Sequence, residues 1–440
     1  MPHELDVPNL HLPRIVIVGG GFGGIELAKK LRNLPVQVVM IDQNNYHTFQ
    51  PLLYQVATAG LEPDSIAFPL RKIFKQQKNF YFRMAKAEQV LPNDNLLLTN
   101  IGKLHYDYLV LATGSTSNYF GMNDIATNSL PMKSLPEALN LRSMILQCFE
   151  NALLTHNLTE RESHTTFVIV GGGPTGVEMA GAMGELKKHV LPNDYPELDF
   201  RRMRIHLIES GDRLLGNMSD ESSQKTLEFL ERLDVHVWLD TFVTAYDGNV
   251  LQTKGGKTIN AKTMIWSAGV KGQIIEGLAP EAIGKGSRIL VDTTNKVIGH
   301  ANIYAIGDVA AMIADDTPRG HPMVAPVAIQ QGQLLGENIA HILQKKETNP
   351  FKYRDKGSMA TVGRNRAVVE VGKMKTQGFI AWFLWMTVHL MTLVGFRNKV
   401  VTLINWIWNY FNYDRGIRLI VRPYKNPNIP NSPHSRQETN

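Results

Sequence analysis

RIVIVGGGFGG (residues 14–24) and TFVIVGGGPTG (residues 166–176) are two copies of one pattern, in which a β-branched run leads directly into G-x-G-x-x-G. A continuous apolar run of this kind is typical of a buried parallel strand. The glycines allow a sharp turn, a close approach of backbone to a pyrophosphate, and tight packing of the next helix, whose N-terminus attracts phosphate. The sequence therefore predicts two dinucleotide sites, and electron transfer from one dinucleotide to the other is the simplest use of both.

An acidic residue follows each copy at the end of the next predicted strand. Residues 36–41 are apolar except for Gln37 and lead to Asp42, about 20 residues after the first loop, where a carboxylate binds the ribose of a dinucleotide. The matching strand of the second copy ends at Glu209, and the longer interval before it predicts a longer helix or an insertion at residues 185–203. Two purely structural turns in an ordinary α/β protein are the alternative interpretation.

The plan of the first copy recurs beyond its glycine loop. Residues 106–114 read as an apolar strand that ends in a tight turn at Thr113 and Gly114, and residues 263–269 end in the same way at Ala268 and Gly269. Residues 301–308 form another strand-like run, which ends in Gly-Asp at Asp308. A helix is predicted from about residue 326 to residue 344.

Length, cysteine count and charge exclude several classes. At 440 residues the chain should hold two or three domains. Its one cysteine, Cys148, excludes an intrachain disulfide, a cysteine zinc site and electron exit through a cysteine pair of this chain, and no metal site is predicted. We expect Cys148 to be a buried small apolar residue. Residues 378–440 hold seven basic and two acidic residues, which accounts for +5 of the net +6, so no nucleic-acid surface is predicted on the body.

The glycine loops, the crossover turns and the Gly-Asp strand together resemble the two-dinucleotide-binding-domain flavoproteins over residues 14–345. The resemblance implies an α/β fold with two Rossmann-like dinucleotide-binding domains, the second inserted in the first, plus a C-terminal helical region that anchors to a membrane. The implied domains are an FAD-binding domain at 1–118 and 286–345, a connecting segment at 119–164, an NADH-binding domain at 165–285, and a C-terminal region at 346–440 with its amphipathic anchor at about 378–420.

Three further segments narrow this resemblance. They are NYHTFQPLLYQVA (residues 45–57), APVAIQQG (residues 325–332) and an aromatic, basic C-terminal tail. Together they resemble the type II NADH:quinone oxidoreductases, single-chain respiratory enzymes that do not pump protons, over nearly the whole chain. The resemblance implies hydride transfer from NADH to FAD and then transfer of two electrons to a membrane quinone. A soluble FAD- and NAD(P)H-dependent ferredoxin-type reductase and an NADH-sensing flavoprotein are the alternatives.

The two dinucleotide sites draw on the loops, their acidic partners and the crossover turns. The residues expected to bind FAD are Gly19, Gly21, Phe22, Gly23, Gly24, Asp42, His47, Thr113, Gly114, Asp308 and Gln331. The residues expected to bind NADH are Gly171, Gly173, Pro174, Thr175, Gly176, Glu178, Glu209, Ala268 and Gly269. On the resemblance Asp308 would bond the ribityl or pyrophosphate of FAD. A turn aspartate that closes a strand is the alternative for Asp308, and a packed loop histidine is the alternative for His47.

Three residues are predicted to be catalytic: Glu178, Gln330 and Lys356. A buried Glu178 with a raised pKa would position NADH or relay a proton to quinone. The helix that carries Gln330 would direct its N-terminus at the flavin pyrimidine edge and stabilise the reduced anion. The amides of Gln330 and Gln331 would bind a quinone carbonyl and the flavin N–H. Lys356 matches a family lysine that reaches toward the flavin.

Each of these assignments has a structural alternative. Glu178 and the two glutamines would then be ordinary first-turn helix residues, and Lys356 a solvated loop lysine. Pro326 stands where the family often has a glutamine, which removes one expected quinone contact. Glu209 favours NADH over NADPH because it accepts from both ribose hydroxyls and repels a 2′-phosphate, whereas the nearby Arg213 argues for NADPH.

The tail predicts a membrane anchor. Residues 378–395 are apolar except for His389 and two threonines, and these 18 residues are borderline for crossing a bilayer core of about 30 Å. In residues 396–411 the apolar side chains fall on one helical face: Phe396, Val400, Val401, Leu403, Ile404, Ile407, Trp408 and Phe411. Four of the six tryptophans, a residue typical of the water–lipid boundary, are Trp382, Trp385, Trp406 and Trp408.

These features predict a monotopic anchor that lies in the interface and attracts anionic headgroups through nearby arginines. A dimer interface and a single transmembrane helix are the alternatives, so a homodimer stays open. Residues 1–13 contain acidic residues and no apolar core, which predicts no secretory signal and a site on the cytoplasmic face of the cell membrane. The expected partners are NADH, a membrane quinone and the lipid surface.

Overall fold

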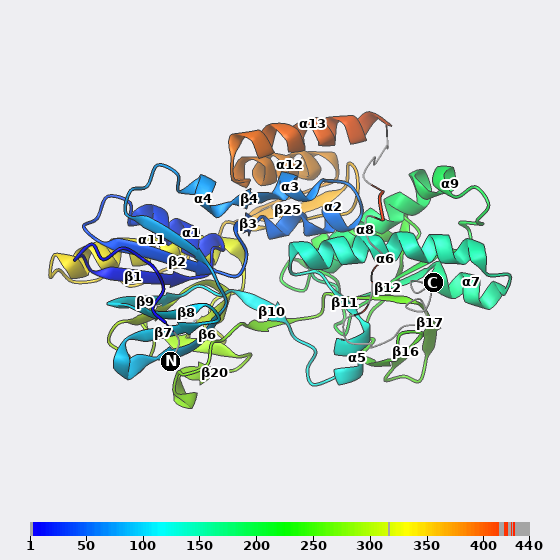
Figure 1. Cartoon of the computed structure of the whole chain (residues 1–440). Helices are drawn as coiled ribbons and strands as arrows, with labels where there is room; N and C mark the ends of the chain where they lie inside the picture. Colours follow the sequence, from blue (N-terminus) through cyan, green and yellow to red (C-terminus); the bar gives the residue numbers. More distant parts are fainter. Residues whose placement is uncertain (1–2, 316, 413–417, 421–423, 425, 427–440) are drawn as a thin grey trace, which may run out of the picture. The chain divides into compact units, whose positions relative to one another are not determined.

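The computed structural model describes residues 3–315, 317–412, 418–420, 424 and 426. The chain forms two compact units that alternate along the sequence (Figure 1). Unit 1 comprises residues 1–48, 67–116 and 270–356. Unit 2 comprises residues 49–66, 117–269 and 357–440. The first glycine loop therefore belongs to unit 1 and the second to unit 2.

Unit 1 is built on a five-stranded parallel sheet. In sheet order the strands are β22 (Ile303–Ala305), β9 (Tyr108–Leu111), β1 (Arg14–Val18), β2 (Gln37–Asp42) and β5 (Phe80–Met84). Successive side chains of a strand point to opposite faces. Ile15 and Ile17 accordingly join a core with Leu27 of α1 (Phe22–Lys30) and Leu335 of α11 (Ala325–Leu343). Because β1 is buried on both faces, it reads as the continuous apolar run that identified it.

The remaining elements of unit 1 cover the other face and the ends of this sheet. They are β3 (Tyr46–Thr48), β4 (Ala67–Pro69), α4 (Leu70–Ile73), β6 (Ala87–Leu91), β7 (Leu96–Thr99), β8 (Gly102–His105), β20 (Ile283–Gly284), β21 (Arg288–Val291) and β23 (Ala310–Met312). Val16 and Val18 of β1 form the second core with side chains of β7, β21 and β23. Short 3-10 turns occur at Pro92–Asp94, Pro280–Ala282 and Gly307–Val309.

Unit 2 repeats the parallel sheet. Its strands, in order, are β11 (Leu130–Pro131), β18 (Thr263–Trp266), β12 (Thr166–Val170), β13 (Arg204–Ile208) and β14 (His236–Trp238). The helices of this part are α5 (Asn123–Asn128), α6 (Leu135–Leu154), α7 (Leu158–His164), α8 (Pro174–His189), α9 (Leu191–Asp194) and α10 (Asp220–Glu231). A three-stranded antiparallel sheet consists of β15 (Val243–Tyr246), β16 (Val250–Thr253) and β17 (Thr258–Asn260). Strands β10 (Ser115–Ser117) and β19 (Val270–Gly272) lie where the chain passes from one unit to the other.

The prediction of an α/β fold with two Rossmann-like sheets is confirmed. The interval before Glu209 is explained by both expected causes. Helix α8 has 16 residues against nine in α1, and α9 with its flanking turns follows before β13.

The C-terminal part of unit 2 joins a small sheet to two helices. Its antiparallel strands are β24 (Ser358–Thr361), β25 (Ala367–Val371) and β26 (Met374–Gln377), and its helices are α12 (Phe379–Thr392) and α13 (Phe396–Asn412). Residues 49–66 of this unit form a 3-10 turn at Gln50–Leu52 and the helices α2 (Leu53–Ala57) and α3 (Pro63–Ile66). Among the described residues, no helix is both long enough and apolar enough to cross a bilayer.

Candidate functional site

The first glycine loop of unit 1 is shaped so tightly that only glycine fits two of its positions. Gly19 has φ +111°, a backbone conformation that costs other residues energy. A Cβ at Gly19 would overlap the carbonyl oxygen of Ala112, and a Cβ at Gly24 would overlap the carbonyl oxygen of Gly19. Strand β1, helix α1 and the crossover turn after β9 are thereby held together at the point where a pyrophosphate would approach.

Asp42 orders this loop. Its Oδ2 accepts the N–H of Gly20 at 2.6 Å, and its Oδ1 accepts the N–H of Asn44 at 2.7 Å. Burial raises the pKa of the carboxyl, although both backbone donors act in the opposite direction. The predicted ribose ligand therefore also fixes the second glycine of its own loop.

The second loop, in unit 2, repeats this arrangement. Gly171 also has φ +111°, and a Cβ at Gly176 would overlap the carbonyl oxygen of Gly171. Glu209 accepts the N–H of Gly172 at 2.5 Å through Oε2 and the N–H of Gly211 at 2.7 Å through Oε1. Arg213, which argued for NADPH, is paired with Asp220 and donates to the carbonyl of Gly216 at 3.1 Å.

Among the helices that the structure describes, those that begin at the candidate cofactor sites start without a side-chain cap, a feature that they share with the short helices α2, α4, α5 and α9 and with α12. Helices α6, α7 and α10 begin with side-chain caps from Ser134, Asn157 and Ser219. Within the part of the chain that the structure describes, α1, α8 and α11 have no such cap. Their first N–H groups therefore remain available, and together with the helix dipole they suit an anionic group.

The remaining predicted FAD residues of unit 1 fit a cofactor. A Cβ added at Gly21 or Gly114 would meet nothing within 4 Å, so the space above both is open. His47 is 3% exposed, and its Nδ1 lies 3.1 Å from the carbonyl oxygen of Gly20. Burial lowers the pKa of His47 to about 4, so the ring is neutral and Nδ1 carries the hydrogen. Its buried Nε2 has no partner among the described residues and can accept from a cofactor hydroxyl or N–H.

Two further FAD candidates are held by short hydrogen bonds. The hydroxyl of Ser115 donates to Oδ2 of Asp308 at 2.6 Å, and the hydroxyl of Thr113 donates to the carbonyl of Gln273 at 2.5 Å. Gln331, which is 1% exposed, accepts the N–H of Gly307 at 2.7 Å. Gln331 thus supports the turn that carries Asp308, in addition to its predicted contact with flavin.

Gln330 and Lys356 lie at the surface of unit 1. The side-chain amide of Gln330 donates to the carbonyl of Arg354 at 2.9 Å and accepts the N–H of Arg354 at 3.0 Å. Pro326 occupies the first turn of α11, where a missing N–H costs no hydrogen bond. Lys356 is exposed and is the last residue of unit 1 before the chain enters unit 2.

Glu178 of α8 is the buried carboxyl that the sequence predicted. It is 7% exposed, and Oε1 accepts the indole N–H of Trp385 at 3.2 Å and the N–H of Thr361 at 3.4 Å. Burial outweighs both donors and raises the pKa of Glu178 to about 8. The group is therefore protonated at neutral pH and can act as a proton donor.

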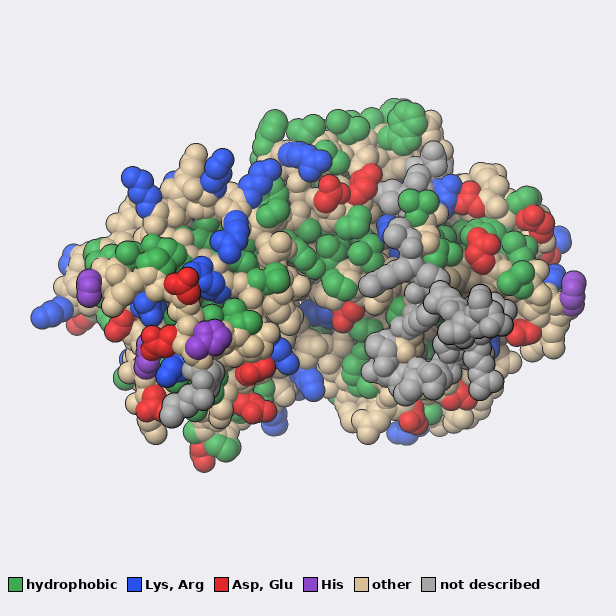
Figure 2. Space-filling model, viewed as in Figure 1, with side chains coloured by type: hydrophobic (Ala, Val, Ile, Leu, Met, Phe, Trp, Pro, Cys, Tyr) green, Lys and Arg blue, Asp and Glu red, His purple; other side chains and the backbone are tan. Residues whose placement is uncertain are grey.

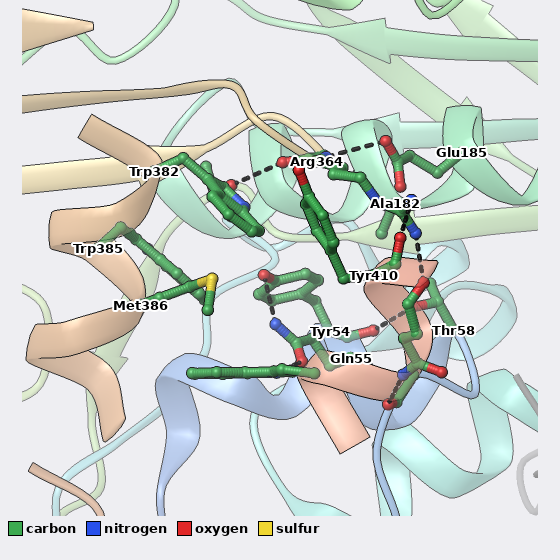
Figure 3. A pocket seen from close by; sticks show the side chains of 15 residues that line it. Tyr54, Gln55, Thr58, Ala182, Glu185, Arg364, Trp382, Trp385, Met386 and Tyr410 are labelled. Atoms are coloured by element: carbon green, nitrogen blue, oxygen red, sulfur yellow. Dashed lines mark hydrogen bonds between the residues drawn. The ribbon is translucent and has the colours of Figure 1, made fainter. Parts of the chain in front are cut away.

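An aromatic pocket of about 110 Å³ lies beside this carboxyl in unit 2 (Figure 3). Its walls come from α2, α8, the turn after β24, α12 and α13, and they include Tyr54, Trp382, Trp385, Met386, Trp406 and Tyr410. Thr361 and Trp385, the two donors to Glu178, both line it. Gln55 is fixed in the wall by the indole N–H of Trp406 at 2.8 Å.

His389 completes the surroundings of Trp385. The two rings stack with centroids 4.1 Å apart, and burial lowers the pKa of His389 to about 4. The indole is therefore held between a neutral imidazole and the carboxyl of Glu178.

The apolar face of α13 points away from the protein body (Figure 2). Phe396, Ile404, Trp408 and Phe411 are 84%, 59%, 59% and 75% exposed. The polar face points inward instead. The side-chain amides of Asn398, Asn405 and Asn409 donate to the carbonyl of Asp64, to Oε2 of Glu62 and to the carbonyl of Gly60.

One expectation about the tail needs correction. The four tryptophans were expected at the water–lipid boundary, but only Trp408 is exposed. Trp385 is 2% exposed because its indole packs against Glu178 and His389, and Trp382 and Trp406 line the aromatic pocket. The basic residues Arg415, Arg422, Lys425 and Arg436 lie outside the described residues.

Cys148 has the predicted environment. Its thiol is 1% exposed and lies 3.3 Å from the hydroxyl of Thr263, and burial raises the pKa of the thiol to about 11. The thiolate needed for redox exchange is therefore absent at neutral pH.

Sequence reasoning missed Thr361, Arg364 and Trp385 as site residues. Arg364 donates its backbone N–H to Oε1 of Glu185 at 2.8 Å, and its guanidinium donates to the carbonyl of Tyr410 at 2.5 Å. No local pattern marks such residues, because their partners lie far away in the chain. The motif at residues 45–57 did contain Tyr54 and Gln55, although no role was assigned to them.

Two family models match the chain. Pyridine nucleotide-disulphide oxidoreductase matches residues 13–332, and the NDH2 C-terminal domain matches residues 356–412. The type II NADH:quinone oxidoreductase Ndh of Mycobacterium tuberculosis is 35% identical over 424 residues, which cover 93% of this chain and 90% of that protein. The type II NADH:quinone oxidoreductase of Haemophilus influenzae is 29% identical and is matched over 86% of this chain and 93% of its own.

A solved structure agrees in fold. The structure of NDH2 from Plasmodium falciparum in complex with NADH superposes with a TM-score of 0.85 at 21% identity. The superposition covers 93% of this chain and 100% of that one.

Proposed function

This chain belongs to the type II NADH:quinone oxidoreductases, and from that membership we propose how its residues divide the reaction. The enzyme is an FAD-dependent, non-proton-pumping NADH dehydrogenase. FAD, when bound, accepts the hydride of NADH and passes two electrons to quinone. The protein contributes binding, orientation and proton supply.

FAD binds in unit 1 and NADH in unit 2. The uncapped N-terminus of α1 supports an FAD pyrophosphate, and Asp42, His47, Thr113 and Asp308 are the polar groups around it. The uncapped N-terminus of α8 supports the NADH pyrophosphate, and Glu209 takes the adenosine ribose. NADH is preferred over NADPH because the carboxylate of Glu209 repels a 2′-phosphate, while Arg213 is paired with Asp220.

The contact between the aromatic pocket and Glu178 carries the assignment of the quinone site. The pocket has apolar, aromatic walls that suit a quinone, and two of its wall residues donate to Glu178. A quinone that takes up two electrons also needs two protons. The hydrogen of the NADH hydride accounts for one of them, and Glu178, protonated at neutral pH and bonded to two residues of the pocket wall, supplies the other. Gln330 and Gln331 remain proposed quinone contacts in unit 1, and Lys356 a proposed flavin contact.

Membrane association follows from α12 and α13. Exposed apolar side chains gather on both helices, and three asparagines of α13 donate hydrogen bonds to residues 60–64. Such a helix lies in the interface with its apolar face in lipid. We propose a monotopic enzyme on the cytoplasmic face of the cell membrane. The same exposed face would also serve a homodimer.

A variant that fills the aromatic pocket tests whether this pocket is the quinone site. Met386→Trp fills the pocket from α12, whereas Met391→Trp changes the 64% exposed side chain of the same helix. The wild-type flavin should be bleached by NADH and reoxidised by a short-chain quinone. Met386→Trp should lose quinone turnover while it keeps NADH-dependent ferricyanide reduction, and Met391→Trp should keep both. Normal quinone kinetics in Met386→Trp would overturn the pocket, and absence of quinone turnover in the wild type would overturn the function.

A further inference from the structure

A second cavity of unit 2 opens near the C-terminal end of α8, and we call it the cationic pocket. It has a volume of about 290 Å³ and is lined mainly by Glu185, Lys188, His189, Arg364, Asn365 and Arg366. Lys188 and His189 belong to the last turn of α8. Arg364, Asn365 and Arg366 belong to the turn between β24 and β25. Two segments far apart in sequence thus bring their basic residues to one cavity.

The cations of this pocket outnumber its acids. Among the described residues that line it, Glu185 is the single carboxylate, against Lys188, Arg364 and Arg366. Burial and the charges of Arg364, Lys188 and Arg366 lower the pKa of His189, although Glu185 acts in the opposite direction. The pocket therefore carries a net positive charge, and an anion placed in it would relieve the mutual repulsion.

Two of the cations keep donors for a ligand. Lys188 donates to the carbonyl of Arg232, which is a neutral partner. In the part of the chain with described coordinates, neither Lys188 nor Arg366 forms an ion pair, and the guanidinium of Arg366 makes no hydrogen bond. Asn365 adds an acceptor, because its buried Oδ1 has no partner among the described residues. Guanidinium and ammonium groups bind phosphate, and an amide oxygen accepts from a hydroxyl.

The cationic pocket is separate from the proposed NADH phosphate site. Helix α8 begins at Pro174, next to the second glycine loop, and ends at His189. At about 1.5 Å per residue its two ends are roughly 20 Å apart. One bound dinucleotide pyrophosphate therefore cannot occupy both places.

The surroundings of the pocket indicate where the phosphate comes from. The guanidinium of Arg364 donates to the carbonyls of Tyr410 and Asn409, in the last turns of α13. The neighbouring Trp408 and Phe411 are 59% and 75% exposed. The cations therefore lie beside the end of the helix whose apolar face is proposed to enter lipid.

We propose that the cationic pocket binds the phosphodiester of an anionic phospholipid with a hydroxylated headgroup. Lys188, Arg364 and Arg366 hold the phosphate, and Asn365 accepts from a headgroup hydroxyl. This proposal rests on the proposed membrane association. It adds a site for one lipid molecule to the general attraction between basic residues and an anionic membrane surface. Free phosphate has the same charge chemistry, so the test must separate the two sources.

The test uses the full-length FAD-loaded enzyme and two matched double variants. Lys188→Ala with Arg366→Ala removes two charges from the pocket. Lys254→Ala with Lys373→Ala removes two exposed charges elsewhere in unit 2. Calorimetry measures the binding of short-chain phosphatidylglycerol, short-chain phosphatidylcholine and inorganic phosphate. Flotation with phosphatidylcholine vesicles, with and without phosphatidylglycerol, measures membrane binding. NADH-dependent ferricyanide reduction verifies that every variant is folded.

Phosphatidylglycerol should bind the wild type and the exposed-charge variant at least about tenfold more tightly than the pocket variant, because two charge-assisted hydrogen bonds are lost. The single variant Arg366→Ala should also bind phosphatidylglycerol more weakly than the wild type. It replaces the double pocket variant if that protein does not fold. Equal binding to both double variants, or phosphate binding as tightly as phosphatidylglycerol, would overturn the lipid site. Continued flotation with phosphatidylcholine would then leave the anchor intact, whereas a wild type that floats with neither vesicle would overturn both proposals.

Discussion

Glu178 owes its chemistry to where its hydrogen bonds converge. The donors from Trp385 and Thr361 both meet Oε1, so Oε2 is the oxygen left to carry the proton. A carboxyl in an apolar site holds its proton because the charged form is poorly solvated. The pKa of about 8 reflects burial that two hydrogen bonds only partly offset.

Glu178→Gln tests this carboxyl through pH. In the wild type, quinone turnover should fall as the pH rises through about 8, because the proton donor is lost. The variant should be slow and lack that alkaline limb. Glu178 also binds its proton up to about pH 8 when folded but only to its ordinary value of 4.5 when unfolded. The free energy of unfolding should therefore decrease between those pH values in the wild type and stay flatter in the variant.

The variant Trp385→Phe tests the same carboxyl by changing its pKa. The indole N–H lowers the pKa of Glu178, so its removal should move the alkaline limb to still higher pH. Trp408→Phe, on an exposed tryptophan, should leave the limb in place. A limb that stays at the same pH in Glu178→Gln would contradict the assignment.

Glu209 combines loop order with ligand recognition. Glu209→Ala leaves the N–H groups of Gly172 and Gly211 without their acceptor, a loss of about 1.5–3 kcal/mol for a charged partner. The KM for NADH should rise about 10- to 100-fold, and the preference over NADPH should shrink. Steady-state kinetics with both nucleotides measure this, with Glu197→Ala as an exposed acid in the same unit. An unchanged KM would show that Glu209 is only a structural residue of the turn.

The positions of some candidate site residues were predictable because a local pattern encodes them. Asp42 and Glu209 each end the strand that follows a glycine loop, and each accepts an N–H of its own loop, although only Asp42 stands at the usual spacing. The partners of Glu178 were not predictable, because Trp385 lies 207 positions away. The contact arises because α8 and α12 both pack on β24, and one sequence carries no local signal of that arrangement.

At the scale of elements, α13 is amphipathic in the reverse sense. In a surface helix the apolar side normally faces the core. Here Asn398 and Thr402 are 4% and 0% exposed, while Phe396 is 84% exposed. Sequence periodicity predicted the two faces of residues 396–411, and the structure adds that the polar face is the one docked on residues 60–64.

Loss of apolar side chains from α13 should release the enzyme from lipid. Burial of one large apolar side chain contributes about 1.5–3 kcal/mol, so Ile404→Ser with Trp408→Ser should weaken vesicle binding at least about 100-fold. Leu154→Ser with Leu158→Ser alters exposed leucines at the ends of α6 and α7 and should have no effect. Vesicle flotation measures both variants. Unchanged flotation of the α13 variant would assign this face to a partner other than lipid, for which the oligomeric state should be measured.

At the scale of the molecule, each unit carries its own glycine loop, acidic partner and uncapped helix. The adenosine diphosphate part of NADH should therefore bind without FAD. ADP-ribose, which lacks nicotinamide, should bind the FAD-stripped and FAD-loaded proteins with equal affinity by calorimetry, and Glu209→Ala should weaken both equally. Re-addition of FAD should restore NADH oxidation, which controls for damage during stripping. Loss of ADP-ribose binding on FAD removal would show that the units are not independent.

The fold class was predictable because each parallel strand is a short apolar run beside a recognisable turn. Strand β1, for example, begins and ends at the predicted residues 14 and 18. The placement of residues 49–66 in unit 2 was not predictable. It depends on packing with α8 and α13, which no pattern in residues 45–57 reveals.

The strand order of unit 1 has a consequence for synthesis. Strand β9 is bordered by β1 on one side and by β22 on the other, yet β22 and the covering helix α11 come after residue 302. A ribosome therefore delivers the first glycine loop at the start and completes its sheet only after the whole of residues 117–269 has emerged. Until then the edge of β9 is unpaired and open to wrong pairings. A premature stop codon between residues 270 and 343 would thus leave unit 1 incomplete, although its first strand is the first one synthesised.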